Sequence, residues 1–213
     1  MEHVEVSTQD ELDRALARAH TVPVCRGNGL FEVAGEAAVE AGDAATVRAR
    51  DHARVEAWGT AVVEAEGDVM VEAWGNAAVE ARDRSIVQAW DGSTVRAHDQ
   101  ATVRAYDRAT VRASDQARVQ ADDHAIVEAW RQTTVEARQR ALVDAWGRAT
   151  IHARGHATVR VRGGATVEAR DETTVEAWGS ATVRASERVV VRICGDDPSV
   201  DGGVVIPAKR SSS

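Results

Sequence analysis

The feature that most constrains this chain is an eight-residue repeat. From Gly29 to Asp196 the sequence divides into 21 consecutive octads without an insertion. Position three is Val in 19 octads, position five is Ala in 18, and position seven is Asp or Gly in 18. A short period sustained over this length indicates a repeat architecture, in which each unit packs mainly on its neighbours.

Each octad also has an internal alternation. Apolar residues at positions one, three and five alternate with Thr, charged or aromatic residues at positions two, four and six. This period of two is typical of a strand with one buried face, whereas a helix requires a period near 3.6. Asp or Gly at position seven tolerates left-handed backbone, so it ends each strand with a turn. Strands and turns without helices between them predict a β-solenoid.

The aromatic residues indicate how many octads form one coil. All six Trp and the single Tyr occupy position six, and these residues are Trp58, Trp74, Trp90, Tyr106, Trp130, Trp146 and Trp178. The first four are successively 16 residues apart, as are Trp130 and Trp146, whereas only Tyr106 and Trp130 are 24 apart. We therefore predict an all-β, two-sided solenoid of about ten 16-residue coils. A three-sided coil is the alternative.

The two ends of a solenoid expose strand edges that must be covered. Residues 1–28 are expected to form an N-terminal α/β cap, with a strand at residues 4–6 and a degenerate octad at residues 21–28. Between them, Thr8-Gln-Asp-Glu11 is a capping box that opens a helix. One face of that helix is expected to carry Leu12, Ala15, Leu16 and Ala19.

The remaining boundaries follow from where the octads end. Residues 29–196 are interpreted as the solenoid. Residues 197–213 are expected to supply a closing strand, with Gly202-Gly203-Val-Val-Ile-Pro207, and then a disordered tail over residues 208–213.

The octad Ala101-Thr-Val-Arg-Ala-Tyr-Asp-Arg108, the strand-helix-strand start and the closing Gly-Gly-Val-Val-Ile resemble a known group of proteins. These are the octapeptide-repeat β-solenoid proteins of actinobacteria and their phages, which carry long runs of Ala-Thr-Val-Xaa-Ala-Tyr-Asp-Ser. The resemblance covers nearly the whole chain. It implies a fold and no function.

Charge and hydropathy exclude several function classes. The net charge of −8 disfavours a general binder of nucleic acid or anionic membranes, because both need a basic field. No apolar run approaches the ~18 residues of a membrane span. The start of the chain lacks the basic and apolar regions of a secretory signal, so a cytoplasmic location is expected. Cys25 and Cys194 are expected at opposite ends of the solenoid, too far apart for a disulfide.

Catalytic and metal chemistry find little support in the sequence. The His residues within the repeats occupy outward or turn positions on different coils, and in a strand-turn His152 and His156 do not converge as they would on a helix. A zinc site needs three or four ligands around one point. Asp and Gly replace each other at position seven, which fits turn geometry better than calcium binding. We therefore expect no enzymatic activity, no cofactor and no metal.

Position four is charged or polar throughout. In the odd-numbered octads, seven of the ten neighbouring steps pair opposite signs along the series Glu32, Arg48, Glu64, Glu80, Arg96, Arg112, Glu128, Asp144, Arg160, Glu176, Arg192. We expect a salt-bridge ladder worth about 0.2–1 kcal/mol per pair. In the even-numbered octads, Glu40, Glu56 and Glu72 are acidic in succession, as in a protein that mimics DNA.

The aromatic residues are the strongest candidate for a functional surface. Outward rings on consecutive coils can stack at ~4.5–7 Å, and stacking alone could account for them. Exposed aromatic patches also commonly mark binding surfaces. The function favoured by the sequence is a non-enzymatic scaffold that binds an unknown protein partner, or itself, through these strips. The alternative is an acidic DNA mimic that inhibits a DNA-binding enzyme, and a polysaccharide-binding or ice-binding solenoid is third.

Overall fold

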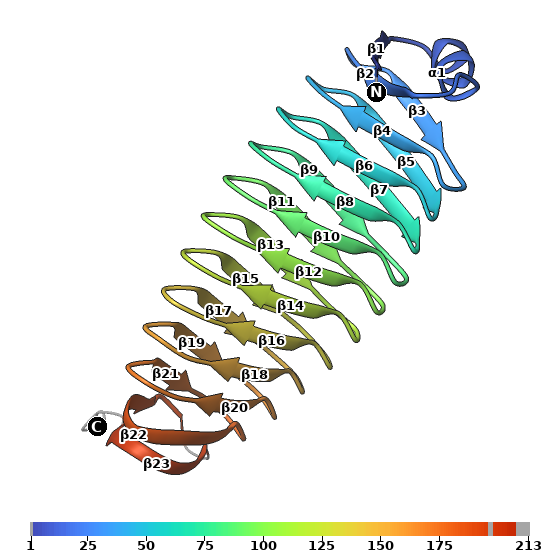
Figure 1. The fold of residues 1–213 in the computed structure, drawn as a ribbon. Helices are drawn as coiled ribbons and strands as arrows, with labels where there is room; N and C mark the ends of the chain where they lie inside the picture. The colour runs from blue at the N-terminus through green and yellow to red at the C-terminus, as the bar shows by residue number, and fades with distance from the viewer. Residues whose placement is uncertain (1, 196–197, 208–213) are drawn as a thin grey trace. The chain divides into compact units, whose positions relative to one another are not determined.

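The computed structural model describes residues 2–195 and 198–207. Its fold is a β-solenoid of parallel strands with one short helix near the N-terminus (Figure 1), as the octads predict. The chain divides into two compact units, Met1–Thr110 and Val111–Ser213.

Unit 1 begins with the cap elements β1 (Glu2–Val6), α1 (Gln9–Leu16) and β2 (Thr21–Cys25). The repeat strands of unit 1 are β3 (Leu30–Val33), β4 (Ala38–Ala41), β5 (Thr46–Asp51), β6 (Arg54–Ala57), β7 (Val62–Gly67), β8 (Met70–Ala73), β9 (Ala78–Ala81), β10 (Ile86–Ala89), β11 (Thr94–Ala97) and β12 (Thr102–Ala105). The boundary between the units falls within β13 (Thr110–Ala113).

Strands of unit 1 pair in parallel with the next strand but one, at a register of 16 residues. Val39 aligns with Val55 and Val55 with Val71, whereas Val47 aligns with Val63 in a separate ladder. The even sheet therefore contains β2, β4, β6, β8, β10 and β12, and the odd sheet contains β3, β5, β7, β9 and β11. Two octads per coil are confirmed, and the three-sided alternative is wrong.

Unit 2 continues with the same register, which aligns Val127 with Val143 and Val143 with Val159. Its strands are β14 (Arg118–Ala121), β15 (Ile126–Ala129), β16 (Thr134–Ala137), β17 (Leu142–Ala145), β18 (Thr150–Ala153), β19 (Thr158–Val161), β20 (Thr166–Ala169), β21 (Thr174–Ala177), β22 (Thr182–Ile193) and β23 (Ser199–Ile206). In unit 2 the even sheet includes β14, β16, β18 and β20, and the odd sheet includes β15, β17, β19 and β21.

The core is built from the inward positions of the octad. In one such octad Ala101, Val103 and Ala105 are all fully buried. Position one carries a hydroxyl in a few octads, and the Ser85 hydroxyl donates to the Arg82 carbonyl at 2.6 Å. The buried Ser93 hydroxyl makes no hydrogen bond to any described residue.

The turns explain why Asp and Gly share position seven. This residue is left-handed in nearly all octads, with φ of 56° at Asp91 and 67° at Gly75. The Asp91 carboxylate also accepts the backbone N–H of Gly75, one coil earlier, at 3.1 Å. Asp83 accepts from Gly67 in the same way at 3.0 Å. Asp thus adds a hydrogen bond between coils, whereas Gly adopts the turn without strain.

The last two octads differ from the sequence expectation of two strands separated by a turn. Instead β22 is a single strand of 12 residues, which pairs with β20 through residues 182–185 and with β21 through residues 190–193. Position seven of octad 181–188 is Glu187, and here the strand continues through residues 186–188.

The N-terminal cap forms as expected, with two differences in detail. The Thr8 hydroxyl accepts the Glu11 N–H at 3.3 Å, but the Glu11 carboxylate accepts from the Ser7 N–H at 2.8 Å and not from Thr8. These hydrogen bonds from Ser7 lower the pKa of Glu11. The helix buries Leu12 and Ala15, whereas Ala19 lies beyond its end and is exposed.

The C-terminal cap is the strand β23, which pairs with β22. Gly202 has a φ of 80°, and a Cβ there would clash with the carbonyl oxygen of Ala185. The Gly-Gly pair therefore lets β23 approach β22 closely. The tail predicted over residues 208–213 lies outside the described residues.

Candidate interaction surfaces

The first candidate surface, the unit 1 aromatic column, lies on the even sheet. Its members Trp58, Trp74, Trp90 and Tyr106 directly follow β6, β8, β10 and β12, and each is half-buried. The Trp74 and Trp90 rings stack at 5.0 Å with 7° between their planes, and Trp90 and Tyr106 stack at 5.6 Å and 16°. The 16-residue spacing therefore brings these predicted residues together on one surface.

Trp58 has different neighbours from the rest of this column. Its ring lies over Gly42, where a Cβ would come within 2.8 Å of the indole. The Arg26 guanidinium lies 5.5 Å from the centre of the Trp58 ring and forms an ion pair with Asp43 at 3.3 Å. At Trp58 the column therefore contacts a guanidinium, that of Arg26, which is paired with the Asp43 carboxylate.

The second candidate surface, the unit 2 aromatic column, lies on the odd sheet. Trp130 and Trp146 stack at 5.4 Å and 11°. Arg162 then lies 5.4 Å from the ring centre of Trp146 and 4.6 Å from that of Trp178. An arginine therefore fills the gap between Trp146 and Trp178.

Sequence reasoning missed Arg26 and Arg162 as members of these columns. A signal was present, because each lies a multiple of 16 residues from a Trp in its own column. The aromatic pattern at position six does not include them, although a guanidinium also stacks on an indole face.

Stacking decides which part of each ring a partner can reach. Trp90 lies between Trp74 and Tyr106 and stacks on both, so its two faces are covered. The indole N–H groups of Trp74 and Trp90 donate to no described residue and are not among the buried, unpartnered atoms. Ring edges and N–H donors are therefore what this column offers to a partner.

An acidic column runs along the same sheet at position four. Glu40, Glu56 and Glu72 align directly in β4, β6 and β8. Glu40 contacts His3 at 2.6 Å. Within the described chain, the carboxylates of Glu56 and Glu72 have no ion pair or hydrogen bond. Two neighbouring like charges therefore stand without an ion pair, although Arg54 lies two residues from Glu56 on the same outward face of β6.

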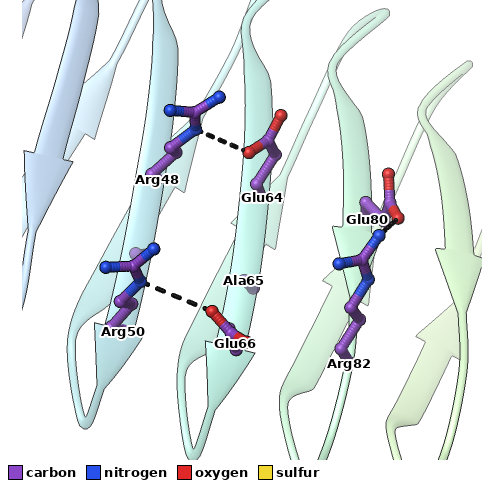
Figure 2. A pocket seen from close by; sticks show the side chains of 8 residues that line it. Arg48, Arg50, Glu64, Ala65, Glu66, Glu80 and Arg82 are labelled. Carbon is purple, nitrogen blue, oxygen red and sulfur yellow. Dashed lines mark hydrogen bonds and ion pairs between the residues drawn. The ribbon is translucent and has the colours of Figure 1, made fainter.

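On the odd sheet, charged side chains form ion pairs with one another (Figure 2). A groove of about 270 Å³ is lined by charged side chains, in which Arg48 pairs with Glu64 at 2.8 Å and Arg50 with Glu66 at 3.4 Å. Five of the seven pairs expected along the odd-octad ladder are formed, namely Arg48–Glu64, Arg112–Glu128, Asp144–Arg160, Arg160–Glu176 and Glu176–Arg192. Most of this charge is satisfied within the chain.

Other candidate chemistry is sparse. Among residues 2–195 and 198–207, no three His, Cys, Asp or Glu side chains gather as a metal site requires. His152 and His156 instead face Glu168 and Glu172 separately, each at 3.3 Å. No helix in the described part of the chain has the length and apolarity to cross a membrane.

Both cysteines are free thiols. Cys25 is buried, which raises its pKa to about 12, so its reactive thiolate form is suppressed. Cys194 is exposed, and desolvation is the main cause that raises its pKa. Neither thiol has the lowered pKa of a catalytic cysteine.

The geometry above defines the protein as a two-sided β-solenoid with outward aromatic columns. Comparison of the chain with protein-family models, with curated proteins and with solved structures finds no match.

Proposed function

We propose that this chain is a non-enzymatic interaction scaffold, which binds a protein partner or a second copy of itself through its aromatic columns. The observation that carries the proposal is the confinement of all seven Trp and Tyr side chains to one outward octad position. In unit 1, the rings of Trp74, Trp90 and Tyr106 form a continuous stack, and the indole N–H groups of the two Trp are not among the buried, unpartnered atoms. Clustered aromatic side chains with free hydrogen-bond donors are typical of interface hot spots.

A triple substitution tests this proposal. Trp58, Trp74 and Trp90 are replaced together by Thr, which is at home on an exposed strand. We expect an unchanged β-type circular-dichroism spectrum and loss of self-association in sedimentation velocity, or loss of partner capture. The matched control replaces the exposed turn residues Gln100 and Gln116 with Ser and should change neither measurement.

Two results would count against the proposal. If the triple variant unfolds, the column is a structural stack and its role as a binding surface loses its basis. If the variant folds and still binds, the partner is held elsewhere on the solenoid.

The second candidate function is a DNA mimic, because Glu40, Glu56 and Glu72 present carboxylates in a row at the coil spacing of about 4.8 Å. A mimic should inhibit a DNA-processing enzyme and lose that inhibition at raised salt. Binding by the Trp variant equal to that of the unaltered protein would favour this candidate over the aromatic columns.

A further inference from the structure

We infer that the even sheet of unit 1 docks an extended, arginine-rich segment of a partner protein. This inference rests on the proposed function, because it names the partner class for the unit 1 aromatic column. The docking surface consists of that column, the acidic column beside it, and the exposed apolar side chains Met70 and Ile86.

The first step is the distribution of charge. Residues 1–110 contain 20 Asp and Glu against 11 Arg, a formal net charge of −9. Residues 111–213 contain 14 Asp and Glu against 15 Lys and Arg, a net charge of +1. The acidity of the whole chain therefore resides in unit 1. A field of this sign attracts cationic partners and raises their rate of association.

The second step is the pair of uncompensated carboxylates. Glu56 and Glu72 are directly aligned on neighbouring strands, and like charges in that arrangement destabilise a sheet. On the odd sheet, by contrast, Arg48 stands beside Glu64 and satisfies it. An external cation would satisfy Glu56 and Glu72 in the same way.

The third step is the preference for arginine. The chain's own Arg26 lies against Trp58 while paired with Asp43, and Arg162 lies between two Trp rings. These contacts show a guanidinium recognised by an indole, in one case with a carboxylate beside it. A planar guanidinium suits such a site better than the compact ammonium group of Lys.

The fourth step is the shape of the occupant. The acidic and aromatic columns both run from strand to strand along unit 1, so they offer a linear track. Alternate side chains of an extended peptide point to one side, so arginines at every second residue face this track. They are about 6.6 Å apart and the coils about 4.8 Å, so the long arginine side chains reach the carboxylates without a matched register. The backbone carbonyls of such a peptide can accept the free indole N–H groups of Trp74 and Trp90.

Two peptides test the inference by isothermal titration calorimetry with the full chain. One is a 12-residue peptide of alternating Arg and Ser, and the other has Lys in place of every Arg, so that the net charge is equal. We expect the Arg peptide to bind about 3- to 10-fold more tightly than the Lys peptide. Its affinity should fall as salt is raised.

Two variants separate the contributions. E56Q/E72Q should weaken the Arg peptide about 3- to 10-fold. W74T should reduce the preference for Arg over Lys, because Trp74 stacks on Trp90 through one face only, whereas both faces of Trp90 are covered. The matched control is Glu128→Gln, which changes a position-four glutamate that is already paired with Arg112, and it should leave peptide affinity unchanged. Circular dichroism confirms that each variant is folded.

Several outcomes would overturn the inference. No binding of the Arg peptide, equal binding of the two peptides, or full affinity in E56Q/E72Q would each do so. If the Trp58, Trp74 and Trp90 substitutions still abolished self-association or capture, the scaffold function would stand without a basic partner. Self-association that is lost in E56Q/E72Q, without peptide binding, would assign the surface to a second copy of the chain.

Discussion

Asp91 tests whether the side chain at position seven stabilises the solenoid by two separable effects. Its backbone is left-handed at a φ of 56°, and its carboxylate accepts the Gly75 N–H at 3.1 Å. Asp91→Ala removes the hydrogen bond and places a less tolerant residue in a left-handed turn. We expect a loss of about 1 kcal/mol for the backbone and about 0.5–1.5 kcal/mol for the hydrogen bond, or roughly 2 kcal/mol together.

Two further substitutions divide that loss. Asp91→Gly relieves the backbone strain and loses only the hydrogen bond, apart from the entropy that Gly adds to the unfolded chain, so about 1 kcal/mol is expected. Asp91→Asn keeps both the left-handed tolerance and an acceptor oxygen, and should change stability by less than about 0.5 kcal/mol. Urea unfolding followed by circular dichroism measures the series. Equal stability of the Ala and Asn variants would refute both parts of the reasoning.

Three other substitutions or probes test the core and the caps. Ser93→Ala should raise the free energy of unfolding by about 1 kcal/mol, because it removes a buried hydroxyl without a partner. Ser85→Ala should lower the free energy of unfolding by a similar amount, because it removes the hydrogen bond to the Arg82 carbonyl. Calorimetric melting compares the two variants. Val103→Asp should lower the free energy of unfolding by more than about 4 kcal/mol, because the Val103 side chain is fully buried. Arg104→Glu, at the next and exposed position, should lower it by less than about 1 kcal/mol. Equal effects in urea unfolding would mean that the buried and exposed faces of the strand are wrongly assigned. A thiol reagent at pH 8 should modify the exposed Cys194 first and reach Cys25 only on unfolding, because burial suppresses its thiolate; fast modification of both in the folded protein would contradict the burial of Cys25.

The regular part of this fold could be predicted from the sequence because each octad position has one structural task. Val at position three is always inward, and the 16-residue spacing of Trp58, Trp74 and Trp90 favoured two octads per coil, which the strand register confirms. The left-handed turn followed from Asp and Gly, the residue types that tolerate it. In a solenoid, local pattern and global fold specify the same arrangement.

The features that escaped prediction depend on contacts between coils. The only sign in the sequence that β22 continues through Glu187 is that position seven is neither Asp nor Gly there. Arg131 and Gln139 also replace Asp or Gly at position seven, yet they keep the left-handed turn with positive φ. The hydrogen bond that the Asp91 carboxylate accepts from Gly75 in the preceding coil depends on side-chain direction, which the repeat pattern does not specify. The lack of a partner for Glu56 likewise depends on which side chains lie next to it.

Arg162 provides the sharpest test of whether the unit 2 column is a continuous stack. The guanidinium contacts Trp146 at 5.4 Å and Trp178 at 4.6 Å, and each exposed cation–π contact is worth about 0.5–1 kcal/mol. Arg162→Ala should therefore lower stability by about 1–2 kcal/mol and change the fluorescence emission of Trp178. Arg162→Lys keeps the charge without the planar group and should recover only part of the loss.

The control for this substitution is Arg148→Ala, because Arg148 is an exposed turn residue in the same unit with the same charge. It should leave both the melting temperature and the Trp emission unchanged. If Arg162→Ala and Arg148→Ala behave alike, the guanidinium contributes only charge, and the unit 2 column ends at the stacked pair of Trp130 and Trp146. If the Lys variant restores full stability, charge without planar stacking suffices, and the same conclusion would remove the reason for expecting arginine over lysine at the docking surface of unit 1.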